Sequence, residues 1–233
     1  MTNQFQNSLN ELTLLLQSKI NQDNAVHMSS YMKNRFSFFG IKTPERRKLT
    51  REWWKKFSIA SESELLNLAN ELWNLEQREF HYVGSDTLKK HKSMLTPSAL
   101  NTLKRLIINN SWWDTVDTLA VHPIGQIILN FSETRQIMDT WIEDDNMWVR
   151  RAAILHQLQF KIETNEHRLF YYCKKCMDEK EFFIRKAIGW ALRQYSYINP
   201  EAVVRFVHQN VKKLSLISKK EALKRINQNT IFK

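Results

Sequence analysis

The sequence predicts an all-α protein, and three features support this fold class: few turn-forming residues, repeated helix-capping pairs and a weak internal repeat. Its 233 residues contain only four glycines and four prolines. Hairpin turns, bulges and Gly-rich phosphate loops depend on these two residue types. A β-sandwich, a Rossmann domain and a P-loop enzyme are therefore not expected.

Several predicted helices begin with residues that cap a helix. Pro44, Pro97 and Pro200 each follow a threonine or an asparagine, a pair that suits a helix start. Ser61 and Glu64 have the spacing of a capping box. Amphipathic helices are predicted near residues 3–19, 22–35, 44–57, 62–75, 78–91, 97–109, 112–130, 132–145, 147–160, 166–177, 181–196, 200–212 and 218–227.

A weak repeat of 35 residues runs through the second half of the sequence. It places Trp113, Trp148 and Phe183 at equivalent positions, and Arg151 matches Lys186 three residues further on. A unit of this length is about one helical hairpin, so the pattern favours stacked hairpins, an α-solenoid whose concave face is the usual binding surface. We predict one such domain over residues 1–233, with a compact helical bundle as the alternative.

Positive charge is concentrated in two segments. The formal net charge is +11, with nine Lys and Arg against two acidic residues in 31–56, and eight against two in 201–233. This distribution favours a polyanionic partner, with nucleic acid first and an anionic membrane surface second. A basic surface that only aids solubility is the remaining alternative.

The sequence predicts a cytoplasmic monomer. Polar residues break up the N-terminal segment, unlike a signal peptide, and no stretch approaches the roughly 20 apolar residues of a membrane span. Cys173 and Cys176 lie in a predicted helix without a second such pair, which indicates buried thiols rather than zinc ligands. The histidines have no metal-binding spacing, and no exposed heptad seam indicates a partner chain.

One predicted helix start carries the candidate carboxylate. Ser111 is expected to cap this helix, with Asp114 completing a variant of the capping box. Asp117 lies four residues after Trp113, which places both side chains on one helix face, whereas Trp112 is expected in the core. An exposed carboxylate in a polar stripe is the alternative for Asp117.

Two further segments supply cations and aromatic side chains. Arg150 and Arg151 point about 100° apart on a helix, and the repeat favours Arg151 as a bidentate phosphate ligand. An inter-helix salt bridge is the alternative. Trp190 lies seven residues after Phe183, on the same helix face, with Arg193 one turn further.

An aromatic pair around a carboxylate is typical of a pocket for a cation. Indole faces attract cations, and a carboxylate between them favours a cationic ligand or a transition state that develops positive charge. On a basic protein, this combination suits a cationic base or a sugar oxocarbenium within a polyanion. Ordinary aromatic packing is the alternative. Gly189, beside Trp190, indicates the close approach of another backbone.

At these residues the sequence resembles the AlkD family of DNA alkylation repair glycosylases. The resemblance covers about residues 5–227 and rests on the blocks 31–36, 39–46, 112–117, 148–154 and 182–193. It implies a HEAT-like solenoid whose concave, basic face holds duplex DNA. It also implies removal of cationic N7-alkylguanine and N3-alkyladenine without a metal or other cofactor, with the lesion left stacked in the duplex.

The resemblance implies a role for each candidate residue. Asp117 would stabilise the oxocarbenium and position the attacking water, flanked by Trp113 and Trp190. The candidate DNA-contacting residues are Tyr31, Arg150, Arg151, Phe182, Phe183, Lys186 and Arg193. Gln159 stands where family members have a lysine that contacts DNA, which predicts a weaker phosphate contact there.

Two other functions remain open. A non-catalytic HEAT-like module would bind nucleic acid or a protein; on DNA, its affinity would fall steeply with salt, and it would release no base. A helical scaffold for protein partners would not bind DNA.

Overall fold

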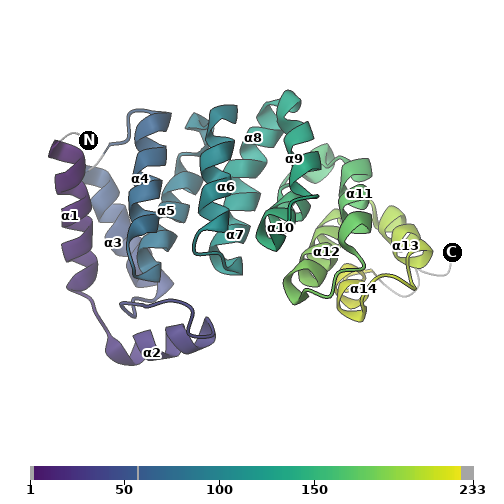
Figure 1. The fold of residues 1–233 in the computed structure, drawn as a ribbon, viewed down its shortest axis with the longest axis horizontal. Helices are drawn as coiled ribbons and strands as arrows, with labels where there is room; N and C mark the ends of the chain where they lie inside the picture. Colours follow the sequence, from purple (N-terminus) through teal and green to yellow (C-terminus); the bar gives the residue numbers. More distant parts are fainter. Residues whose placement is uncertain (1–2, 57, 227–233) are drawn as a thin grey trace. The chain divides into compact units, whose positions relative to one another are not determined.

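The computed structural model describes residues 3–56 and 58–226, and every regular element within them is a helix (Figure 1). The all-α prediction is therefore confirmed, with helices packed in the repeat-like arrangement of an α-solenoid. The chain divides into two compact units, one that ends at Met94 and one that begins at Leu95. The single domain over residues 1–233 stays a prediction.

The first unit is built from helices that bury leucine and tryptophan side chains. Its elements are α1 Asn3–Gln17, α2 Gln22–Tyr31, α3 Thr43–Lys56, α4 Glu62–Asn74, α5 Arg78–Lys90 and the 3₁₀ turn Lys92–Met94. Helices α4 and α5 pack against each other, and α3 packs against α1 and α5. Trp53 is buried between them and donates its indole N–H to the carbonyl of Ser8, so α3 is fixed against α1.

A buried glutamate holds the loop between α2 and α3. Glu79 is 0% exposed and accepts hydrogen bonds from the backbone N–H groups of Phe39, Gly40 and Ile41, at 2.9–3.1 Å. Gly40 has a φ of 87°, and a Cβ there would lie 2.0 Å from the carbonyl oxygen of Asn21. The loop that leads into the basic helix α3 therefore has one fixed conformation.

The second unit carries the rest of the helices. They are 3₁₀ turn Pro97–Ala99, α6 Leu100–Ile108, α7 Trp113–Leu119, π-helix Ala120–Ile124, α8 Gly125–Asn130, 3₁₀ turn Ser132–Thr134, α9 Arg135–Trp141, α10 Met147–Leu155, 3₁₀ turn Lys161–Glu163, α11 Glu166–Cys176, α12 Phe182–Tyr195, α13 Pro200–Gln209 and α14 Leu216–Ala222. Helix α10 packs against α6, α7, α9 and α12, and α12 packs against α11, α13 and α14 (Figure 1). Each hairpin therefore contacts its neighbours in sequence, as solenoid repeats do.

Most of the predicted caps are present. The Ser61 hydroxyl accepts from the N–H of Glu64 at 3.2 Å, although the Glu64 carboxylate accepts from Ala60 rather than from Ser61. Thr96 and Asn199 cap their helices through side-chain oxygens, as predicted. At the remaining proline start, α3 begins one residue earlier than predicted, at the threonine itself.

The helix predicted over 112–130 is present, but its hydrogen-bond pattern changes in the middle. The prediction that Ser111 caps it is wrong, because its hydroxyl donates to carbonyls at the end of α6 and the helix begins at Trp113. Pro123 has no N–H to continue the α-helical pattern, and the π-helix accommodates it. This π-helix directly follows the helix that carries the candidate carboxylate.

Candidate active site

A pocket of about 290 Å³ in the second unit contains the candidate carboxylate and one candidate tryptophan. Asp117 reaches it from α7 and Trp190 from α12. The other lining residues are Thr118, Val121, His122, Leu158, Gln159 and Gln194. The sequence analysis singles out Gln159 but neither His122 nor Gln194, because no motif includes them.

Arg151 on α10 holds the Asp117 carboxylate with two hydrogen bonds. Its Nε lies 2.7 Å from Oδ1 and its Nη2 lies 2.8 Å from Oδ2. Its Nη1 donates to the carbonyl of Phe183, so one guanidinium links α7, α10 and α12. Arg151 is 4% exposed. The structure thus shows the inter-helix salt bridge, and a direct phosphate contact does not fit a buried guanidinium whose three nitrogens all donate within the protein.

Burial and the arginine act in opposite directions on the pKa of Asp117. Removal of the carboxylate from water raises its pKa, and the nearby Asp114 adds to the rise, whereas Arg151 lowers it by charge and hydrogen bonding. Desolvation is the largest of these effects, so the pKa of Asp117 lies above its ordinary value. The two-point contact with the guanidinium fixes the orientation of the carboxylate oxygens.

Three aromatic rings form a cluster that the predicted repeat describes only in part. The ring centroids of Trp112 and Trp148 are 5.7 Å apart, and Phe183 lies 5.0 Å from each. The repeat assigned Trp113 to this position, but the structure places the preceding residue there. Phe183 is half-buried in this cluster. Aromatic packing of this kind is the alternative to a DNA contact that the sequence leaves open. Trp113 is half-buried on α7 and is not among the described residues that line the pocket.

Arg150 belongs to a structural ion pair. Its guanidinium binds Glu179 at 2.9 and 2.6 Å and also donates to the carbonyls of Asp144 and Asp145. These contacts tie the start of α10 to the segment after α11. Its guanidinium is thus bound by protein acceptors, and a contact of Arg150 with DNA stays a prediction.

Lys186 and Arg193, both on α12, share the carboxylate of Glu221 on α14. Lys186 Nζ lies 3.0 Å from one oxygen of Glu221, and Arg193 Nη1 donates to the other. The side chains of Lys186 and Arg193 are 40% and 26% exposed, so both remain accessible. Glu221 is not predictable as a site residue from sequence, because no motif distinguishes it within its lysine-rich segment.

Two candidate aromatic residues lie at the surface. Tyr31 ends α2 in the first unit and is 70% exposed, and Phe182 begins α12 in the second unit and is 55% exposed. Their exposure makes them accessible to a macromolecule. Their contacts with DNA stay predictions.

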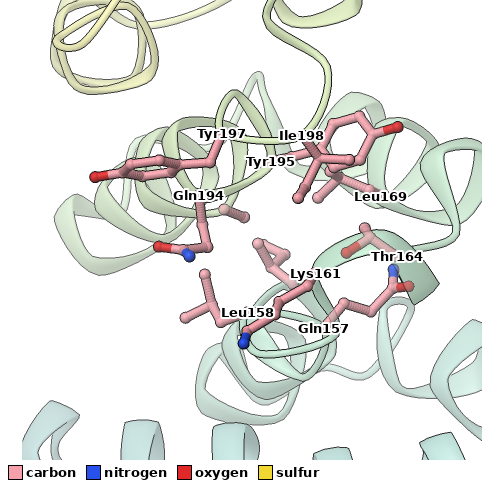
Figure 2. A pocket seen from close by; sticks show the side chains of 11 residues that line it. Gln157, Leu158, Lys161, Thr164, Leu169, Gln194, Tyr195, Tyr197 and Ile198 are labelled. Atoms are coloured by element: carbon pink, nitrogen blue, oxygen red, sulfur yellow. The ribbon is translucent and has the colours of Figure 1, made fainter.

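A second pocket, of about 250 Å³, shares Leu158 and Gln194 with the first one. Figure 2 shows Tyr195, at the end of α12, with Tyr197 and Ile198 from the segment after it, across the pocket from side chains of the segment that follows α10. Most of the lining is apolar. The two pockets are therefore neighbours, and only the first contains a carboxylate.

Within the described part of the chain, no three His, Cys, Asp or Glu side chains are arranged to hold a metal ion. Cys173 and Cys176 are buried, and burial raises the pKa of both thiols, that of Cys176 to about 12. Among the same described residues, no helix combines the length and apolar character that crossing a membrane requires.

Comparison with known proteins gives the family of this helical-repeat protein. Residues 12–226 match the family described as DNA alkylation repair enzyme. A solved structure described as a predicted DNA alkylation repair enzyme from Enterococcus faecalis is 31% identical, with a TM-score of 0.84 over 90% of this chain and 98% of that chain. No curated protein matches. The chain belongs to the DNA alkylation repair enzyme family, so its role is in the repair of alkylation damage and its substrate is DNA.

Proposed function

We propose that the protein is a DNA glycosylase that hydrolyses the N-glycosidic bond of N7-alkylguanine and N3-alkyladenine in duplex DNA. The observation that carries this proposal is the Asp117 carboxylate, which lines an open pocket beside Trp190 while Arg151 fixes its orientation. A carboxylate placed in a cationic protein repels phosphate and attracts positive charge. The carboxylate oxygens, held by Arg151, are proposed to face a cationic lesion in DNA.

The proposed reaction needs a single carboxylate because the leaving group is already activated. An N7- or N3-alkylated purine carries a positive charge, and the electrons of the C1′–N bond neutralise it as the bond breaks. The sugar becomes an oxocarbenium, which the negative charge of Asp117 stabilises. Water then attacks C1′ and loses its proton to solvent. Because the purine already departs as a neutral base, no general acid is required.

The neighbouring residues have distinct roles in this proposal. Trp190 packs against the sugar of the lesion, and its indole face favours the developing cation. Arg151 acts through Asp117 as a positioning residue, since it is too buried to touch DNA. Trp113, Tyr31 and Phe182 are proposed to contact the duplex. We also propose that the lesion stays stacked and that the protein acts as a cytoplasmic monomer.

The raised pKa of Asp117 predicts how base release depends on pH. The carboxylate must be ionised to stabilise the oxocarbenium, so the rate should fall as the pH falls through that raised pKa. In Asp117→Asn, the residual rate should not show this acidic limb. An unchanged limb in the variant would assign the titration to another group.

The test of this function is base release from two duplexes of the same sequence, one with a cationic lesion and one with a neutral lesion. One contains 7-methylguanine, which is cationic, and the other contains 8-oxoguanine, which is neutral. We expect release of 7-methylguanine and no release of 8-oxoguanine, with both duplexes bound. Binding of both without release of either base would contradict the proposal and favour a non-catalytic DNA-binding module.

A further inference from the structure

Helix α14 contacts the face of α12 that carries Trp190. Lys186, Trp190 and Arg193 are spaced by four and three residues, so they share one face of α12. Of these, Trp190 lines the Asp117 pocket, so the two cations flank a pocket residue one helical turn to either side.

Gly189 allows α14 to approach this face closely. A Cβ at Gly189 would lie 2.6 Å from the Cβ of Glu221 and 3.0 Å from the carbonyl oxygen of Ser218. Ser218 also donates its hydroxyl to the carbonyl of Arg185 at 2.8 Å. The backbone of α14 is therefore held against α12, and Glu221 has little freedom to move away. This confirms the close approach that the sequence predicted at Gly189.

The Glu221 carboxylate lies beneath two accessible cations. Its side chain is 15% exposed, less than that of Lys186 or Arg193. Both cations lower its pKa, so the carboxylate is ionised at neutral pH. Lys186 keeps two ammonium N–H donors beyond its bond to Glu221, and Arg193 keeps its Nε and Nη2, which have no partner within the described chain.

We propose that Glu221 is a positioning residue that anchors Lys186 and Arg193 as a clamp for one DNA backbone phosphate beside Trp190. The three charged groups sum to +1, and the outward donors of the two cations suit the oxygens of a phosphate. Because the carboxylate is partly buried and α14 is held against α12, it restricts both long side chains to positions beside Trp190. The inference rests on the proposed function, because it gives the clamp the task of aligning the lesion sugar with Asp117.

The test compares Glu221→Gln with wild type in two measurements. The glutamine keeps the packing against Gly189 but removes the negative charge and replaces one acceptor oxygen with an N–H donor, so the two cations lose the separate oxygens that hold them. The single-turnover rate of 7-methylguanine release should fall about tenfold or more, since small misplacement of reacting groups is costly. Affinity for lesion-free duplex should not weaken, and its salt dependence should steepen by about 0.9 in log–log slope, because one more positive charge is uncompensated.

The matched control is Glu143→Gln. Glu143 also forms an ion pair, with Lys175 at the surface, and its loss changes the net charge by the same amount. It does not contact α12, so release and the salt slope should stay at the wild-type values. A wild-type release rate in Glu221→Gln would overturn the proposal, as would an equal loss in the control.

A double-mutant cycle tests whether Glu221 acts through the two cations or only holds α12 and α14 together. In a Lys186→Gln/Arg193→Gln background, adding Glu221→Gln should cause no further loss of release, because the carboxylate acts only through the two cations. Additive losses would overturn the clamp. If wild type releases no base, the proposed glycosylase fails, and the clamp is then judged on lesion-free duplex alone. Lys186→Gln/Arg193→Gln should then weaken binding to lesion-free duplex. Unchanged binding would overturn the clamp as well.

Discussion

Arg151 on α10 binds the candidate carboxylate of Asp117 on α7 and the carbonyl of Phe183 on α12. Its burial does not suit a phosphate ligand. Removal of one partner of a buried ion pair leaves the other charge uncompensated and costs about 3–5 kcal/mol. Arg151→Gln should therefore lower the free energy of unfolding of the second unit by about 3 kcal/mol and slow base release.

The same variant should leave the salt dependence of duplex binding unchanged, because Arg151 is 4% exposed. Chemical denaturation and binding titrations over a range of salt measure both effects. A log–log slope that becomes shallower by about 0.9 would show that Arg151 contacts a phosphate after all.

His156 is a buried histidine whose protonation opposes folding. Burial lowers its pKa to about 4, while its ring donates to the carbonyl of Ala153 at 2.6 Å. In the unfolded chain the pKa returns to about 6.5, so the unfolded state binds a proton first on acidification. The stability that neutral His156 contributes above pH 6.5 is lost as the pH falls toward its folded-state pKa of about 4.

This linkage predicts a loss of about 2 kcal/mol between pH 7 and pH 5 from His156 alone. Urea denaturation of wild type and His156→Gln at both pH values measures the difference. The variant should lose less stability than wild type over this interval. Equal losses in the two proteins would mean that folding does not change the pKa of His156.

At the scale of elements, the loop between α2 and α3 depends on a side chain from another helix. Glu79→Ala would leave three backbone N–H groups without their acceptor, and each unsatisfied buried donor costs roughly 1–3 kcal/mol. We expect the amides of residues 39–41 to lose hydrogen-exchange protection. Glu76→Ala, at an exposed position nearby, is the control and should keep it. Retained protection in Glu79→Ala would show that the loop is held by other contacts.

Helix positions were predictable because their determinants are local. Asn199 caps α13 and Pro200 is its first residue, so neighbouring residues alone mark the start of this helix. Ser111 has the same chemistry, but its hydroxyl closes the preceding helix instead, a choice between two helix ends that local sequence does not decide.

Site residues were predictable only where a motif lies within one helix. Asp117 and Trp190 were identified by their motifs, and the structure brings both to one pocket. The partners of the charged groups were not identified. Arg151 reaches Asp117 across 34 residues and Lys186 reaches Glu221 across 35, so these pairings depend on how the helices stack.

At the scale of the whole molecule, the positive charge of the chain is expected to determine how duplex affinity depends on salt. The net charge of +11 includes a basic segment over 31–56, in which Lys48 and Arg51 are exposed on α3. If six to ten phosphates are contacted, affinity for lesion-free duplex should fall about 10³–10⁵-fold between about 50 and 200 mM salt.

Lys48→Gln/Arg51→Gln should make this salt dependence shallower by about 2 in log–log slope. The control, Lys174→Gln/Lys180→Gln, removes two exposed lysines outside the basic segments and should have a much smaller effect. Equal effects of the two pairs would show that net charge, and not its location, governs binding.

If one carboxylate stabilises the oxocarbenium, base release should depend on Asp117, and single-turnover cleavage by Asp117→Asn measures this dependence. The asparagine keeps the size of the side chain but removes the negative charge that faces the oxocarbenium. On duplex DNA containing 7-methylguanine, we expect a rate lower by about 10²–10³-fold, with duplex affinity retained. Release of 7-methylguanine by the variant at the wild-type rate would show that Asp117 is not the catalytic carboxylate.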